Sequence, residues 1–383
     1  MWNIRWGRLF RRSLAVCFAA VALWLLLAGA AVGAAGGIGE ETLAFAALRT
    51  ELGEVQSPLP FWQRLAVSQS LLLERNPGDL EHRESRPVET LEPLPNAQPA
   101  PDHDDVQDQP QITAAPEDIV ERTLTPLSSE GYATGAGLYL YNRTKLEVDL
   151  TSALYQDLPF SLAPAEAGPQ ILIIHTHTTE AYTPDGVDVY APSDNNTRTL
   201  EEPYNMLRVG DEMEAVFTEM GLSVVHDRGV YDYPAYNGAY DRSGAAVKAY
   251  LEQYPTIKLV LDVHRDALVG GDGTVYKAVT TVDRVKTAQV MVVVGTNAGG
   301  SEHPNWQENL ALGAKLQKNL DTLYPTLARP MALRTSAYNQ GLCPGSLLVE
   351  VGTHGNTLQE ALAGARDFAR AAGAVFLGLV EEG

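Results

Sequence analysis

Histidines and carboxylates stand at the ends of apolar stretches in this chain, or inside them, and the chemistry that they suit is metal binding. The residues concerned are His175, His177, Glu180, His264 and Glu350. Burying such side chains without partners costs several kcal/mol, so their positions indicate a function rather than a contribution to stability. Neutral imidazoles and carboxylates are ligands for zinc, and a catalytic zinc site uses about three protein ligands and one open position. The sequence therefore predicts a zinc site.

The spacing of these residues suggests a role for each. His177 and Glu180 have the H-x-x-E spacing, which lets both side chains reach one ion from a single turn of chain. His264 supplies a third ligand from another strand, and Glu350 is then the general base for the attacking water. His175 either hydrogen-bonds a ligand within the catalytic group or replaces His177 as the ligand. Two histidines at i and i+2 point the same way only in a continuing strand, so both alternatives stay open.

Other side chains compete for these roles. Glu201 and Glu202 offer a carboxylate in place of Glu180, although an acid pair before a helix also favours the helix dipole. His226 ends another apolar run and is an alternative ligand. We interpret Cys343 as a loop residue rather than a nucleophile. A serine mechanism lacks its G-x-S-x-G signature.

Charge and cysteine content exclude several classes of protein. The first 35 residues hold four arginines and no acid, which leaves −24 on the rest of a chain whose formal net charge is −20. Neutralising phosphates needs a surplus of Lys and Arg, so the acidic remainder argues against nucleic-acid binding. Two cysteines, one of them in an N-terminal apolar run, form neither a disulfide framework nor a thiolate metal site.

The chain divides into parts of different composition. Residues 13–35 are almost wholly apolar, about the length of a bilayer-crossing helix, with arginines only on their N-terminal side. A cleaved signal peptide is the competing interpretation, and in either case the rest of the chain is exported. We predict a cytoplasmic tip and transmembrane anchor (1–37), a membrane-proximal segment (38–75), a disordered acidic, Pro-rich tether (76–131) and a catalytic domain (132–383).

The catalytic domain alternates apolar strands with amphipathic helices. Strands are predicted at 137–142, 170–175, 222–225, 257–264, 275–282, 290–295 and 347–351. Helices are predicted at 205–220, 244–254, 308–323 and 358–379. This alternation indicates an α/β domain with a mostly parallel central sheet and helices on both faces. In such folds the site lies at the carboxyl ends of the strands, where the histidines and carboxylates are expected to meet.

Four segments resemble the signatures of one family, stage II sporulation protein P. They read ILIIHTHTTEAYTP at 171–184, NMLRVGDEM at 205–213, LVLDVHRDA at 259–267 and YNQGLCPGSLLVEVGTHGNTLQEA at 338–361. They occur in the family's order across residues 132–383, and together they are highly specific.

The resemblance implies a zinc-dependent peptidoglycan hydrolase of the sporulating cell wall. It implies an amidase/phosphorylase-hydrolase-like fold related to the N-acetylmuramoyl-L-alanine amidases, with endopeptidase activity as well. It further implies action in forespore engulfment with stage II sporulation proteins D and M, from a single-pass anchor in the engulfing septal membrane. The family's essential histidines fall on His175 or His177 and on His264, and its acidic residue falls on Glu350.

The mechanism that we expect is amide hydrolysis. Glu350 takes a proton from the attacking water and returns it to the leaving amine. Arg265 or Asn339 holds the substrate or stabilises the tetrahedral oxyanion. Two alternatives remain open: a zinc carboxypeptidase-like peptidase, and a catalytically silent scaffold that binds the cell wall.

Overall fold

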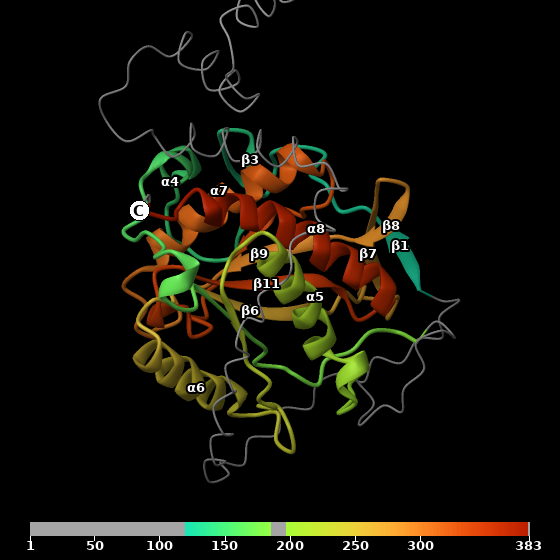
Figure 1. Ribbon diagram of the computed structural model, residues 1–383. Helices are drawn as coiled ribbons and strands as arrows, with labels where there is room; N and C mark the ends of the chain where they lie inside the picture. Colours follow the sequence, from blue (N-terminus) through green and yellow to red (C-terminus); the bar gives the residue numbers. More distant parts are fainter. Residues whose placement is uncertain (1–118, 185–196, 382–383) are drawn as a thin grey trace, which may run out of the picture. The chain divides into compact units, whose positions relative to one another are not determined.

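The computed structural model describes residues 119–184 and 197–381 (Figure 1). The predicted anchor, the membrane-proximal segment and most of the predicted tether lie outside these ranges. Among the described residues, no helix combines the length and the apolar character needed to cross a membrane.

Within the described ranges, eight strands form the central sheet, in the order β2-β3-β10-β9-β11-β6-β4-β5. The strands of this sheet are β2 (Ala133–Gly135), β3 (Leu138–Asn142), β4 (Ile171–Ile174), β5 (Val224–His226), β6 (Leu259–Asp266), β9 (Val290–Val294), β10 (Met331–Leu333) and β11 (Ser346–Thr353). Neighbouring strands run parallel except at two places: β2 is antiparallel to β3, and β9 is antiparallel to β11. The predicted α/β class with a mostly parallel sheet is therefore confirmed. Apart from the edge strand β2, the sheet nevertheless consists of two parallel blocks that run in opposite directions and meet at β9 and β11.

A smaller sheet lies beside the central one, and it includes a strand from the segment predicted as a tether. It consists of β1 (Val120–Arg122), β7 (Tyr276–Val282) and β8 (Val285–Ala288), and β1 runs parallel to β7. The prediction placed β1 in the tether and β7 among the strands of the main sheet. Residues 120–122, which the prediction assigns to the tether, are therefore paired with a strand of the predicted catalytic domain.

Helices cover the two faces of the central sheet unequally (Figure 1). The helices are α4 (Leu150–Tyr155), α5 (Met206–Glu219), α6 (Ala239–Gln253), α7 (Trp306–Leu323) and α8 (Leu358–Leu377), with short 3-10 turns at Ala165–Ala167, Glu202–Tyr204 and Gln340–Leu342. One face packs against α4, α5, α7 and α8 in the largest apolar cluster, to which β6 contributes Leu261 and Val263.

The opposite face is covered by α6 over β4, β5 and β6, through residues such as Val247 and Tyr250. Over β9 and β11 this face carries only a small apolar cluster, which includes Val293 and Leu348. Side chains alternate between the two faces along a strand, so His264 and Glu350 point to the α6 side. The part of the sheet that α6 leaves uncovered is where the candidate site lies.

Local signals explain where the site-bearing helices begin and end. Asn205 caps α5, and its side chain accepts a hydrogen bond from the backbone N–H of Leu207. Gly221, with φ of +88°, follows the helix in the left-handed conformation that favours glycine. Thr357 and Glu360 form a capping box at the start of α8. Helix α6 begins at Ala239, five residues before the predicted start at Gly244.

Candidate metal and catalytic site

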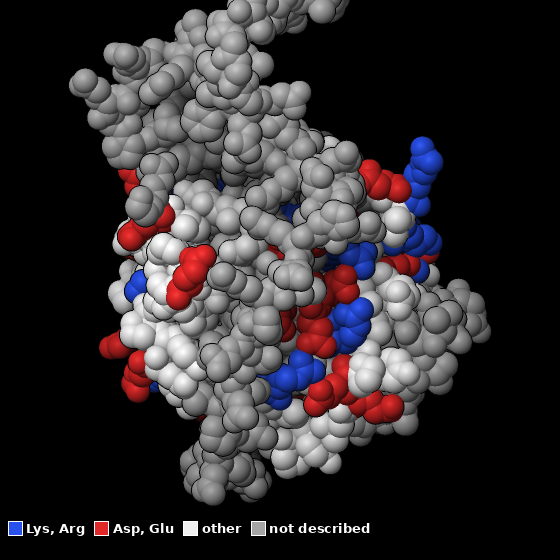
Figure 2. All heavy atoms as spheres, viewed as in Figure 1, with Lys and Arg blue, Asp and Glu red and all other residues white. Residues whose placement is uncertain are grey.

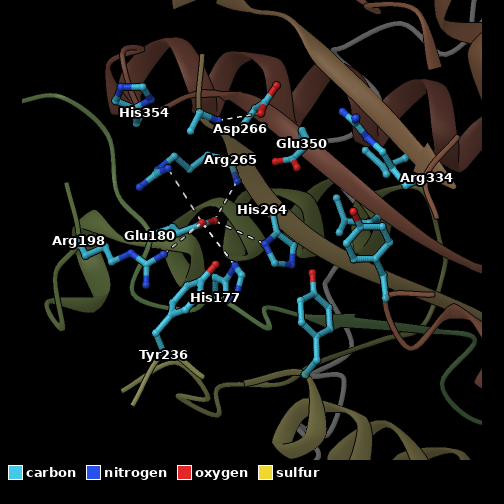
Figure 3. A pocket seen from close by; sticks show the side chains of 15 residues that line it. His177, Glu180, Arg198, Tyr236, His264, Arg265, Asp266, Arg334, Glu350 and His354 are labelled. Carbon is cyan, nitrogen blue, oxygen red and sulfur yellow. Dashed lines mark hydrogen bonds and ion pairs between the residues drawn. The ribbon is translucent and has the colours of Figure 1, made fainter. Parts of the chain in front are cut away.

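Three side chains from the segment after β4 and from β6 form a compact set of ligand atoms. His177 and Glu180 follow β4, and His264 lies in the carboxyl-terminal half of β6. Their ligand atoms all lie within 4.8 Å of one another. The Nδ1 atom of His177 is 3.6 Å from Glu180 Oε1, and the Nδ1 atom of His264 is 3.5 Å from Glu180 Oε2. Figure 3 shows both rings directed toward the Glu180 carboxylate.

The tautomer of His264 follows from its other ring nitrogen. Nε2 lies 2.8 Å from Asp262 Oδ1. That carboxylate accepts hydrogen bonds from the backbone N–H and the hydroxyl of Thr176, at 2.9 and 2.7 Å. These bonds and His264 hold the pKa of Asp262 below its usual value against the opposing effect of burial, so it is an ionised acceptor. His264 therefore donates from Nε2 and turns Nδ1 toward Glu180, the arrangement by which carboxylates orient metal-binding histidines. Without a metal, Asp262 and Glu180 raise the pKa of His264 well above its usual value despite burial, so Nδ1 carries a proton that a bound ion would replace.

Positive charges surround Glu180. Burial alone would raise the pKa of its carboxyl, but Arg265, His177 and His264 hold that pKa well below its usual value. Arg198 Nη2 lies 3.8 Å from Glu180 Oε1, and the backbone N–H of Arg265 donates to Oε2 at 3.3 Å. Glu180 is therefore an ionised ligand in a position that is nearly closed to water.

Glu350 lies on β11 directly opposite His264 on β6. Its Oε2 atom is buried and has no hydrogen-bond partner among the described residues. Burial, followed by the nearby charge of Asp266, raises the pKa of Glu350 to about 8. A carboxyl group with a pKa near neutrality and one oxygen free of structural hydrogen bonds has the properties of a general acid–base.

The ligand set opens into a cavity of about 400 Å³. Its lining residues are His177, Glu180, Arg198, Tyr236, Tyr240, His264, Arg265, Asp266, Ala267, Val293, Arg334, Tyr338, Leu348, Glu350 and His354. The ring of Tyr236 stacks on that of His177, with centroids 4.5 Å apart, and the guanidinium carbon of Arg198 lies over the Tyr236 ring, 4.5 Å from its centroid. Tyr240 is near-parallel to His264 at 6.4 Å. The cavity is large enough for a small substrate group, and aromatic rings fix the orientation of both histidines.

Zinc fits this donor set. Bonds of 2.0–2.2 Å in a tetrahedral site separate the ligand atoms by roughly 3.3–3.6 Å, which the two nitrogen–oxygen distances of 3.5 and 3.6 Å match. His177, Glu180 and His264 would hold the ion, and the cavity leaves a fourth position open.

The two predicted substrate-binding residues occupy different positions. Arg265 lines the cavity, but its guanidinium also donates to the carbonyl oxygens of Ala181 and Thr197, at 2.9 and 3.3 Å. Asn339 lies outside the cavity lining formed by the described residues, and its amide donates to the carbonyl oxygen of Tyr240 at 2.7 Å. Asn339 thus holds the backbone of a lining residue, whereas Arg265 faces the cavity itself.

His175 is not part of the ligand set. Its Nδ1 donates to the carbonyl oxygen of Val263 at 2.8 Å, and its Nε2 lies 2.9 Å from Nε2 of His226 beneath α5. Burial, together with the neighbouring His226, lowers the pKa of His175 to about 3. The geometry therefore favours His177 as the ligand and gives His175 a role in packing. Glu201 and Glu202 are exposed and do not line the cavity, so they do not replace Glu180.

Several residues of the site were not predicted from the sequence. Asp262 orients His264, and Arg198 and Tyr236 pack behind His177. The segment 231–240 contains four tyrosines before and at the start of α6, and this aromatic density was the available signal for Tyr236 and Tyr240. No sequence signal pointed to Arg198, because its approach to Glu180 depends on the β-bridge between residues 180 and 198.

Fold and site together define a class: an α/β protein with a buried set of two histidines and one carboxylate beside a cavity. The model of the family described as Stage II sporulation protein P matches residues 84–373, more than half of the chain. The chain therefore belongs to the Stage II sporulation protein P family. The protein of that name from Bacillus subtilis (strain 168) is 27% identical over 205 residues, which are 50% of this chain and 47% of that one. The chain thus spans about half the length of the curated relative that it matches.

Solved structures with similarity to the chain include two amidases. The CwlD amidase of Clostridioides difficile, solved with the GerS lipoprotein, is 14% identical, with a TM-score of 0.33 over 55% of this chain and 95% of that one. The N-acetylmuramoyl-L-alanine amidase AmiC2 of Nostoc punctiforme is also 14% identical, with a TM-score of 0.30 over 55% of this chain and 96% of that one. TM-scores below 0.5 do not carry an assignment of function.

Proposed function

We propose that this chain is a zinc-dependent peptidoglycan hydrolase that cleaves the amide bond between N-acetylmuramic acid and L-alanine, and also peptide cross-links. The observation that carries the proposal is the position of Glu350, whose Oε2 atom is buried without a hydrogen-bond partner among the described residues, across one strand pairing from His264. A general base beside a set of two histidines and one carboxylate is the arrangement that metal-assisted amide hydrolysis requires.

The residues divide the work of the reaction. Zinc, when bound by His177, Glu180 and His264, would polarise the scissile carbonyl and lower the pKa of the attacking water. Glu350 accepts the proton of that water on its carboxylate and then donates it to the nitrogen of the leaving amine. Asp262 keeps His264 in the tautomer that ligates. Tyr236 and Tyr240 hold the rings of the two histidines by ring contacts in the cavity wall.

The cavity also suits an acidic peptide substrate. Arg265 and Arg334 line it on either side of Glu350 (Figure 3). Guanidinium groups bind carboxylates through paired hydrogen bonds, and the stem peptides of peptidoglycan carry carboxylates. The two arginines thus offer positive charge to the substrate in a protein that is acidic overall.

The proposal includes a cellular context. The N-terminal apolar run would anchor the chain in the membrane with the hydrolase outside, at the engulfing septal membrane of a sporulating cell. Stage II sporulation proteins D and M would be its partners in engulfment. These points rest on the sequence of the first 37 residues and on the family resemblance.

Digestion of purified sacculi by the full chain tests the function. Mass spectrometry should find free stem peptides that begin at L-alanine and, from cross-linked material, cleaved bridges. A peptidase of the carboxypeptidase type would instead release single C-terminal residues, and a silent scaffold would bind sacculi without releasing anything. Either result would refute the proposed amidase.

A further inference from the structure

A second cluster of possible ligands lies between α5 and the end of β5, away from the cavity. Asp211 and Glu214 stand one turn apart on α5, and His226 ends β5. Their ligand atoms all lie within 4.8 Å of one another. Nδ1 of His226 is 3.1 Å from Asp211 Oδ1 and 3.4 Å from Glu214 Oε2. Figure 2 shows acidic side chains gathered over α5 with basic ones beside them, and none of these three residues lines the cavity.

His226 is the buried member of this cluster. The residue is 7% exposed, and its Nδ1 has no hydrogen-bond partner in the described part of the chain, although two carboxylate oxygens lie within 3.4 Å. A buried polar atom left unsatisfied costs about 1–3 kcal/mol. The carboxylates are therefore near the ring nitrogen without the alignment of a hydrogen bond.

The hydrogen bonds of His175 and of His226 Nε2 determine whether Nδ1 of His226 carries a proton or a lone pair in the neutral ring. A backbone carbonyl only accepts, so His175 must donate from Nδ1 to Val263 at 2.8 Å. The neutral His175 ring then accepts at Nε2, and the Nε2 atom of His226, 2.9 Å away, is the donor. A neutral His226 ring consequently carries its lone pair on Nδ1, which faces two carboxylates. Burial lowers the pKa of His226, but Asp211 and Glu214 raise it above its usual value overall, so either a proton or a metal ion at Nδ1 removes the repulsion.

Helix α5 is built to admit the two rings. A Cβ atom on Gly210 would lie 2.3 Å from His226 Nε2 and 2.5 Å from His175 Nε2. Glycine inside a helix costs about 1 kcal/mol relative to alanine, so its presence in the middle of α5 has a packing reason. The glycine gives the two imidazoles the space in which His226 is directed at Asp211 and Glu214.

We propose that Asp211, Glu214 and His226 form a second metal site, which takes a divalent transition metal of the zinc type in a structural role. An imidazole ligand selects zinc and its neighbours over calcium and magnesium, which prefer oxygen ligands. The distances of 3.1 and 3.4 Å are close to the roughly 3.3–3.6 Å between ligands of tetrahedral zinc. The ion joins α5 to β5 and, through His226, supports His175 at the end of β4.

Arg228 is compatible with this site. Its Nη1 donates to Asp211 Oδ1 at 2.6 Å, which offsets one of the two carboxylate charges and leaves one for the metal. The Asp211 and Glu214 side chains are 39% and 36% exposed, so an ion reaches the site directly from solvent.

Zinc content tests the proposal on the full chain, equilibrated with buffered zinc and measured by elemental analysis. The wild-type chain should hold two ions, the Asp211→Asn/Glu214→Gln variant one, and the His264→Ala variant one. Glu212→Gln is the matched control, because Glu212 lies on the same helix but pairs with Arg208 and Arg366. It should keep both ions.

A melting series separates this inference from the proposed catalytic site. Zinc should still raise the melting temperature of the His264→Ala variant, and adding Asp211→Asn/Glu214→Gln should abolish that rise. The inference is overturned if the wild-type chain holds one ion and the His264→Ala variant none, since a proton then fills the position at His226. If the His264→Ala variant keeps the full wild-type content, the proposed catalytic site is the one that fails.

Discussion

Replacing Glu350 by Gln should remove catalysis while making the metal-free chain more stable. The substitution keeps the shape of the side chain and removes its ability to take a proton. General-base catalysis contributes about 10²- to 10⁴-fold, so the rate of sacculus hydrolysis should fall by at least about 10²-fold. Zinc content should stay unchanged, because Glu350 is not among the three clustered ligands.

The gain in stability follows from the pKa of Glu350. The folded carboxyl holds its proton to about pH 8, whereas the reference value is 4.5. Its raised pKa means that the metal-free wild-type chain loses stability as the pH rises from 4.5 to 8, and the glutamine variant does not. The full shift corresponds to about 3 kcal/mol at pH 7. Because the residue is partly open to the cavity, we expect about 2 kcal/mol, or a rise in melting temperature of roughly 4–8 °C.

The assay compares one preparation of each chain, after chelation, by thermal melting at pH 5 and pH 7. The difference between variant and wild type should be larger at pH 7 than at pH 5. Hydrolysis rate and zinc content are measured on the same preparations before chelation. A variant that melts below the wild type at pH 7 yet hydrolyses sacculi normally would show that Glu350 is a structural residue, and the assignment of the base would be wrong.

Three further predictions concern the site and the packing under α5. His264→Ala should abolish hydrolysis and the zinc bound at Glu180, whereas His103→Ala, in the segment predicted as a tether, should change neither; equal losses would place the site elsewhere. Asp262→Asn should weaken zinc binding at that site by about 10- to 100-fold, because the tautomer of His264 is no longer fixed, and metal titration measures the change. Gly210→Ala should lower the free energy of unfolding, measured in urea, by about 1–3 kcal/mol, because the added Cβ meets two imidazoles. Alanine is the better helix former, so a stabilised variant would contradict the packing described under α5.

The sequence was most informative where local chemistry decides the structure. The strands that carry His264 and Glu350 and the helix that follows Asn205 were predicted within a few residues, because an apolar run, a capping side chain and a glycine stop are all local signals. The direction of β9 was not predictable in this way. Its antiparallel pairing with β11 depends on how distant segments pack, and a short apolar strand reads the same in either direction.

The choice between His175 and His177 shows the same limit on a smaller scale. The rule that residues i and i+2 point the same way holds only inside a strand, and β4 ends at Ile174. The chain then turns, so that His175 faces α5 and His177 faces the cavity. A strand end is uncertain by a residue or two from sequence, and that uncertainty is as large as the spacing in question.

The pairing of β1 with β7 also determines how the domain responds to mechanical force applied through its N-terminal side. The chain before residue 119 enters the domain through β1, which has three residues and whose Val120 N–H donates to the carbonyl oxygen of Val275 at 2.9 Å. Tension applied from the N-terminal side therefore acts on this short pairing before it reaches the central sheet. Loss of the β1–β7 pairing leaves β6 and β11 paired, so His264 and Glu350 keep their register. Detachment of β1 therefore relieves the tension before it can distort the site.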